Sequence, residues 1–116
     1  MDARIEKLHD WGCDTNAAMD RMLGDEDFYL ECLCSIPADK NFELLTAALE
    51  RQDVQTAFEC AHTLKGVLAN LGLTPMYQKT IEIVEPLRAG DSRALLGKAA
   101  ALTEMKNHLA EILQKN

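Results

Sequence analysis

The chain has 116 residues and a formal net charge of −7, which suits one domain with its own hydrophobic core. Apolar residues make up 47% of it, with only one Trp, two Tyr and three Phe. The core is therefore expected to consist of Leu, Ala, Ile and Met, as in helical bundles. Acidic residues occur throughout and no basic cluster is present, which argues against nucleic acid as a partner.

The N-terminus and the cysteines indicate a reduced, cytoplasmic setting. The opening residues MDARIEKLHDW contain no apolar stretch of signal-peptide length, and no window approaches a transmembrane span. Cys13, Cys32, Cys34 and Cys60 lack the spacing of a disulfide or zinc framework. We therefore expect a cytoplasmic protein with free thiols and no membrane partner.

Short helices are expected in the N-terminal part of the chain. Trp11–Gly12 breaks the first of them, and Gly24 ends the second. Asp14 or Thr15 can cap that second helix, and Asp25 opens the helix that follows. No alternating strand pattern competes with these helix signals.

Longer helices with clear boundaries make up the rest. Asp53 can cap the helix that ends at Gly72, and Thr74–Pro75 begins the next one because proline suits a first helical turn. Pro86 bends or ends the last turn of that helix. Gly90–Asp91 then separates it from the final helix.

Short connections between long amphipathic helices predict antiparallel neighbours. We expect an all-α fold, an antiparallel up-down four-helix bundle with additional short N-terminal helices, forming a single domain over residues 1–116. The short helices are expected over about 3–22, and the longer ones over about 25–36, 39–51, 53–71, 74–88 and 92–114.

One segment of the 53–71 helix contains the candidate site. The sequence AHTLKGVLANLG, residues 61–72, places His62, Lys65 and Gly66 on one face, because residues three and four apart are neighbours on a helix. A glycine inside a helix costs about 1 kcal/mol relative to alanine. A helix that accepts this cost beside a histidine indicates a need for open space there.

Helix geometry predicts that His62 points away from the core. At about 100° per residue, His62 lies roughly 140° from the middle of the apolar stripe of its helix. Its neighbours include one aromatic residue, Phe58, and a small residue, Ala69, which leave the imidazole accessible. An accessible imidazole can act as a nucleophile. The stripe consists of Ala57, Ala61, Leu64, Leu68 and Leu71.

The segment AHTLKGVLANLG resembles the active-site motif of histidine-containing phosphotransfer (HPt) domains, whose usual form is close to AHxLKGxxxxLG. The similarity extends upstream through LGDEDFYLECL and ALERQDVQTAFECAHTLKG and downstream to LRAGD. The resemblance implies a four-helix bundle that takes part in a phosphorelay of two-component signalling. His62 would accept a phosphoryl group from the aspartyl phosphate of a receiver domain, become a phosphohistidine, and pass the group to another receiver.

The resemblance also implies roles for the neighbouring residues. Lys65 would balance charge on the phosphoryl group, and Gly66 would make room for the incoming active site. Independently of the resemblance, we expect an apolar docking patch around His62 that includes Phe58, Ala69 and Met76. The implied partners are response-regulator receiver domains and a hybrid histidine kinase. No cofactor is expected, because any metal ion would be supplied by the receiver partner.

Two positions depart from the family's pattern. Val67 follows the glycine where many members have a small polar residue. Members also often hold the imidazole through a Gln or Glu of the next helix, and the corresponding position here is Val84. Glu82 or Glu85 could orient the imidazole instead, if that helix is slightly rotated.

A metal-binding bundle is one alternative, because di-iron bundles use Glu-x-x-His pairs from two helices. The chain contains two such pairs, Glu6–His9 and Glu59–His62. The first pair lies in a short charged segment, the second points away from the core stripe, and Lys65 would repel a cation. We therefore expect no metal ligands, and His9 and His108 are interpreted as surface residues.

A docking module that never uses its histidine is the other alternative. An autonomous kinase is excluded, because the six glycines stand singly at positions 12, 24, 66, 72, 90 and 97 and form no nucleotide-binding loop. The phosphoryl group must then come from another protein or a small phosphodonor. The chain is expected to be a phosphotransfer protein without kinase activity.

Overall fold

The computed structural model describes residues 1–114, so the last two residues of the domain expected over 1–116 lie outside the described part. Every regular element within that part is a helix, which confirms the expected all-α class. The helices are α1 (Ala3–Asp10), α2 (Thr15–Arg21), α3 (Glu26–Cys34), α4 (Asn41–Glu50), α5 (Val54–Asn70), α6 (Thr74–Arg88) and α7 (Leu96–Leu113).

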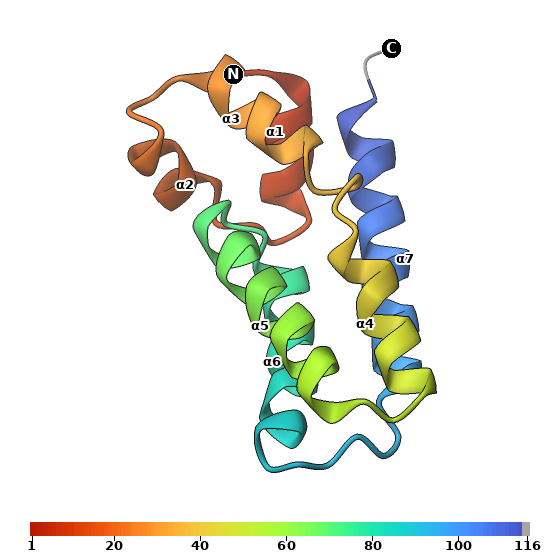
Figure 1. Cartoon of the computed structure of the whole chain (residues 1–116). Helices are drawn as coiled ribbons and strands as arrows, with labels where there is room; N and C mark the ends of the chain where they lie inside the picture. Colours follow the sequence, from red (N-terminus) through yellow and green to blue (C-terminus); the bar gives the residue numbers. More distant parts are fainter. Residues whose placement is uncertain (115–116) are drawn as a thin grey trace.

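The four C-terminal helices form a helical bundle. Each packs against two others, because α4 contacts α5, α5 contacts α6, α6 contacts α7, and α7 contacts α4. Figure 1 shows the three N-terminal helices gathered at one end of this group, with α7 long enough to run beside both parts. Both α1 and α3 contact α7, while α2 contacts α1 and α3.

Aspartates begin four of the helices: Asp2 begins α1, and three others begin α2, α3 and α5. Asp14, Asp25 and Asp53 each accept a hydrogen bond from the backbone N–H three residues later, at 3.1, 3.0 and 3.1 Å. Such a cap is worth about 1 kcal/mol because it satisfies a free N–H of the first turn. Of the two caps considered for α2, Asp14 is therefore the one used, and Asp53 fixes the start of α5.

The last helix begins later than the sequence predicts. Residues 92–95 precede α7 instead of forming its first turn, and the helix starts at Leu96. The carboxylate of Asp91 accepts a hydrogen bond from the backbone N–H of Arg93 at 2.9 Å. Ala94 has a φ of 61°, which a right-handed helix does not allow. Two smaller differences are that α3 ends at Cys34 and α4 begins at Asn41.

The apolar stripe expected on α5 faces the core. All five of its residues are buried, each at most 5% exposed, and they join one continuous hydrophobic cluster with residues of the other helices. The 3.6-residue period of the sequence therefore predicts the orientation of α5 correctly. The buried stripe residues are Ala57, Ala61, Leu64, Leu68 and Leu71.

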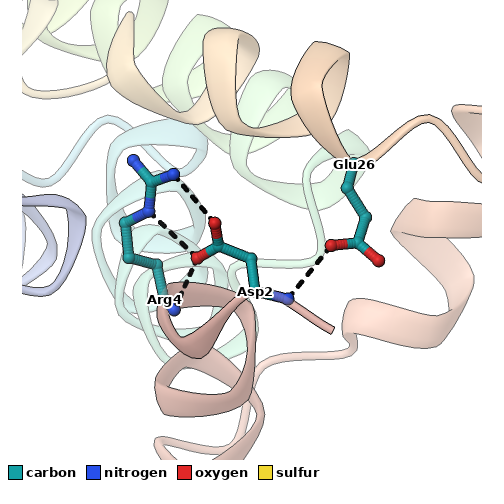
Figure 2. A network of polar contacts seen from close by, with 3 residues as sticks. All are labelled: Asp2, Arg4 and Glu26. Carbon is teal, nitrogen blue, oxygen red and sulfur yellow. Dashed lines mark hydrogen bonds and ion pairs between the residues drawn. The ribbon is translucent and has the colours of Figure 1, made fainter. Parts of the chain in front are cut away.

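A network of polar contacts joins α1 to α3. Figure 2 shows the backbone N–H of Asp2 donating to the carboxylate of Glu26 at 3.0 Å. The carboxylate of Asp2 in turn accepts two hydrogen bonds from the Arg4 side chain, at 2.9 and 3.0 Å. The start of the chain is thereby linked to the first turn of α3.

The N-terminal helices also hold the end of α5. The buried Tyr29 hydroxyl of α3 donates to the carbonyl of Leu71 at 2.7 Å, and burial raises the pKa of this phenol. Arg21 of α2 donates to the carbonyl of Asn70 at 2.9 Å. The backbone N–H of Asp14 donates to the carbonyl of Gly72 at 2.8 Å. These contacts use carbonyls that a helix end leaves without a partner.

Candidate functional site

His62 lies in the middle of α5 with its side chain exposed. The residue immediately before it, Ala61, is fully buried against the core. The imidazole therefore points outward, as the helical geometry predicts. It makes no hydrogen bond or ion pair with any of residues 1–114, so no protein group is bonded to either ring nitrogen.

An aromatic contact holds the imidazole instead. The rings of Phe58 and His62 stack with centroids 5.6 Å apart and planes inclined by 23°. Phe58 is half-buried and packs against the core cluster. Phe58 makes a second contact with Arg88, whose guanidinium carbon lies over the phenyl ring, 5.3 Å from its centroid. The three side chains form a row that begins on α6 and ends at the exposed imidazole of α5.

Lys65 and Gly66 lie one turn after His62. Lys65 is half-buried, and its ammonium group has no ion-pair partner anywhere in the described range. Gly66 is exposed, and a Cβ atom added there would meet nothing within 4 Å beyond the backbone of its own helix. The face beside the imidazole thus combines an uncompensated positive charge with open space, an arrangement suited to an anionic group that approaches from outside.

The expected orienting carboxylates are engaged elsewhere. Glu82 accepts hydrogen bonds from Lys98 at 2.8 Å and from Lys79 at 3.4 Å, and these two bonds lower its pKa. Glu85 pairs with Arg88 at 3.4 Å. Neither carboxylate bonds to His62, so the structure does not bear out that expectation. The physical reason is that each carboxylate has a cation within reach.

The residues expected in the docking patch are only partly accessible. Ala69 is exposed and Phe58 is half-buried, so both can contribute to a surface beside His62. Met76 is fully buried, and its expected place in the patch is wrong. Val84 is fully buried as well, and its side chain has no atom that could hydrogen bond to the imidazole.

The sequence analysis did not predict the stacking of His62 on Phe58 or the contact of Arg88 with Phe58. The spacing of four between Phe58 and His62 is a usable signal, because residues so spaced are neighbours on a helix. Arg88 gave no such signal, because its position over Phe58 depends on how α6 packs against α5. The structure therefore adds one residue from a second helix to the site.

The other histidines have different surroundings. His108 of α7 makes an edge-to-face contact with Trp11, with centroids 4.7 Å apart, and His9 lies on α1. In the alternative metal pair, Glu59 accepts a hydrogen bond from Gln55 at 2.8 Å. Among the residues that the structure describes, no three His, Cys, Asp or Glu side chains are placed to bind a metal ion. Nor does this part contain a helix that is long and apolar enough to cross a membrane.

A comparison with known families finds a match over the part of the chain that contains these residues. The model of the Hpt domain matches residues 37–115, a range that includes all of α4 to α7 and every candidate site residue. No curated protein and no solved structure matches the chain. The similarity that the sequence suggests upstream of residue 37 lies outside the family match. Because the match covers well over half of the chain, the protein belongs to the Hpt domain family, the histidine phosphotransfer modules of two-component signalling.

Proposed function

We propose that His62 is the phosphoryl carrier of this Hpt domain. The matched range contains two histidines, His62 and His108. Only His62 has an unpaired lysine and open space one turn away along its helix, whereas His108 packs against Trp11. This difference in surroundings is the observation that carries the assignment.

The proposed step transfers a phosphoryl group between an aspartate and a histidine. The lone pair of an unprotonated ring nitrogen of His62 forms the N–P bond, and the P–O bond to the aspartyl carboxylate breaks. The carboxylate leaves with that electron pair, and the reverse step regenerates free His62. Lys65 offsets negative charge on the phosphoryl oxygens. In-line alignment of the attacking nitrogen with the leaving carboxylate oxygen accelerates the transfer.

The partners follow from the same assignment. A receiver domain would supply the aspartyl phosphate and the metal ion, and a second receiver would take the phosphoryl group from His62. A hybrid histidine kinase would stand upstream. A cytoplasmic location and an antiparallel up-down order of α4 to α7 belong to this proposal. The ring of helix contacts and the short α4–α5 and α5–α6 connections support the up-down order.

Incubation with a phosphorylated receiver domain tests the assignment. We expect the protein to acquire an acid-labile, alkali-stable phosphate, which is the behaviour of a phosphohistidine. The label should be absent in His62→Gln and unchanged in the matched control His108→Gln. Lys65→Gln should slow labelling by about tenfold, equivalent to about 1.4 kcal/mol in the transition state.

The same experiment separates phosphotransfer from a purely scaffolding role. Full labelling of His62→Gln, or no labelling of the unmodified protein by any phosphorylated receiver, would contradict the proposal. A docking module would still bind receivers after His62→Gln but would carry no phosphate in either form. Mass spectrometry of the labelled protein at alkaline pH identifies the modified residue directly.

A further inference from the structure

We propose that Phe58 is a positioning residue for the His62 imidazole, acting through ring stacking, and that Arg88 holds the Phe58 ring in place. The proposal rests on the proposed role of His62 as phosphoryl carrier. It assigns the orienting function to an aromatic side chain of α5 itself instead of a polar side chain of α6.

The geometry of the two rings fits an attractive stack. Their centroid separation of 5.6 Å and inclination of 23° correspond to offset stacking, for which separations of about 4.5–7 Å are typical. The spacing of four residues on one helix places the two side chains on adjacent turns. Because α5 is capped by Asp53 and anchored on the core through its apolar stripe, both rings start from a fixed backbone.

No polar group competes for this orienting role. The two carboxylates of α6 that were expected to orient the imidazole have other partners. Glu82 pairs with Lys79 and Lys98, and Glu85 pairs with Arg88. Within residues 1–114 no hydrogen bond reaches the imidazole. Stacking on Phe58 is therefore the contact that restricts rotation of the His62 ring.

Stacking restricts the ring without occupying its nitrogens. The phenyl ring covers a face of the imidazole, whereas both nitrogens lie at the edge. A hydrogen-bonding side chain would engage one of them. Here one nitrogen can attack the phosphorus while the other carries its proton toward solvent, and the ring still samples fewer orientations before attack, which favours reaction.

Arg88 connects this arrangement to α6. Its guanidinium carbon lies 5.3 Å from the Phe58 centroid, within the range of a cation–π contact. Its ion pair with Glu85 at 3.4 Å limits where the guanidinium can go. Phe58 is thus held from one helix and contacts the nucleophile on another turn of its own helix.

Two variants of Phe58 separate stacking from simple packing. Phe58→Leu keeps an apolar side chain but removes the ring, and Phe58→Tyr keeps the ring. Phe28 of α3 is another accessible phenylalanine, 49% exposed, so Phe28→Leu serves as the matched control. Thermal unfolding of all three variants establishes that each one folds.

The first measurement is the NMR spectrum of the unphosphorylated protein. We expect the carbon-bound ring protons of His62 to be displaced from their free-histidine positions by the phenyl ring current. The displacement should disappear in Phe58→Leu, persist in Phe58→Tyr and Phe28→Leu, and decrease in Arg88→Gln. Unchanged His62 signals in folded Phe58→Leu would overturn the proposal.

The second measurement is the rate of phosphorylation of His62 by phosphoramidate, a small donor that needs no docking surface. Loss of the stack should slow this reaction by about 2- to 10-fold, the range expected for one aromatic contact. Phe58→Tyr should restore the rate. Equal rates in the unmodified protein and Phe58→Leu would contradict positioning, even if transfer from a receiver were slowed through docking.

The two proposals fail in distinguishable ways. If receivers do not label the unmodified protein, His62 is not the carrier, yet the NMR experiment still reports whether Phe58 orients the ring. If receivers label His62 while Phe58→Leu leaves both the ring signals and the phosphoramidate rate unchanged, the carrier role stands and the positioning role is wrong.

Discussion

Gly66 lowers the stability of its helix but leaves open space beside His62. It lies inside α5, where glycine is about 1 kcal/mol less favourable than alanine. A Cβ atom at this position would meet nothing within 4 Å, so packing does not require the glycine. The cost to the helix is consistent with selection for open space beside His62.

Gly66→Ala is therefore expected to stabilise the protein by up to about 1 kcal/mol, because alanine loses less backbone entropy on folding. Gly66→Leu should remain folded but slow transfer from a receiver, since its side chain fills the space beside the imidazole. Urea denaturation gives the free energy of unfolding, and labelling gives the transfer rate.

Gly97 of α7 is the matched control, because a Cβ atom there also meets nothing within 4 Å. Gly97→Ala should leave transfer unchanged. A loss of stability in Gly66→Ala would show that the glycine is needed for packing, and normal transfer by Gly66→Leu would show that access is not limited there.

The candidate site could be predicted from sequence wherever one helix determines it. His62, Lys65 and Gly66 share a face of α5, so their spacing alone brings them together. The Lys98 partner of Glu82 could not be predicted, because Lys98 lies on α7 and its reach depends on the packing of α6 against α7. The pairs Lys79–Glu82 and Glu85–Arg88, by contrast, have the three-residue spacing of neighbours on one helix. The sequence therefore predicts which residues are neighbours on one helix, but not which residues of different helices contact each other.

At the scale of elements, the same limit explains the boundaries. Asp25 and Asp53 identify helix starts because their caps depend on backbone N–H groups only three residues away. The delayed start of α7 depends on the left-handed conformation of Ala94, a residue type that gives no signal for it. Local rules thus predict the helices, while unusual turns between them escape prediction.

The turn between α5 and α6 makes a specific demand on Gly72. Its φ of 67° is in the left-handed region, and a Cβ atom would overlap the backbone carbonyl of Asp14. Gly24 has a φ of 77°, but a Cβ atom there meets nothing within 4 Å. The two glycines therefore share the conformational requirement and differ in the steric one.

Gly24→Ala is expected to cost about 1 kcal/mol, the price of a left-handed alanine. Gly72→Ala should cost at least about 1 kcal/mol more, because backbone atoms cannot yield as a flexible side chain can. Thermal and urea unfolding of both variants measure the difference. Equal losses would mean that the Asp14 segment moves away without cost.

The molecule consists of the helical bundle α4 to α7, which the Hpt family model matches, and of three helices that precede the matched residues. Tyr29, Arg21 and Asp14 all bond to carbonyls at the end of α5, which is the helix of His62. The N-terminal helices therefore complete the hydrogen bonding of the site helix. The single domain that the sequence predicts stays a prediction, and these bonds between the two parts are the reason to test it.

Tyr29→Phe tests this dependence with the smallest possible change. The buried carbonyl of Leu71 would lose a hydrogen bond of 2.7 Å, and an unsatisfied buried acceptor costs about 1–3 kcal/mol. We expect unfolding at a lower temperature but still in one transition by all probes, because one core cluster runs through both parts. Amide exchange should accelerate at the end of α5, whereas phosphorylation of His62 by phosphoramidate, two to three turns away, should be unchanged. Two separate transitions in the unmodified protein would instead show that the N-terminal helices and the bundle fold independently.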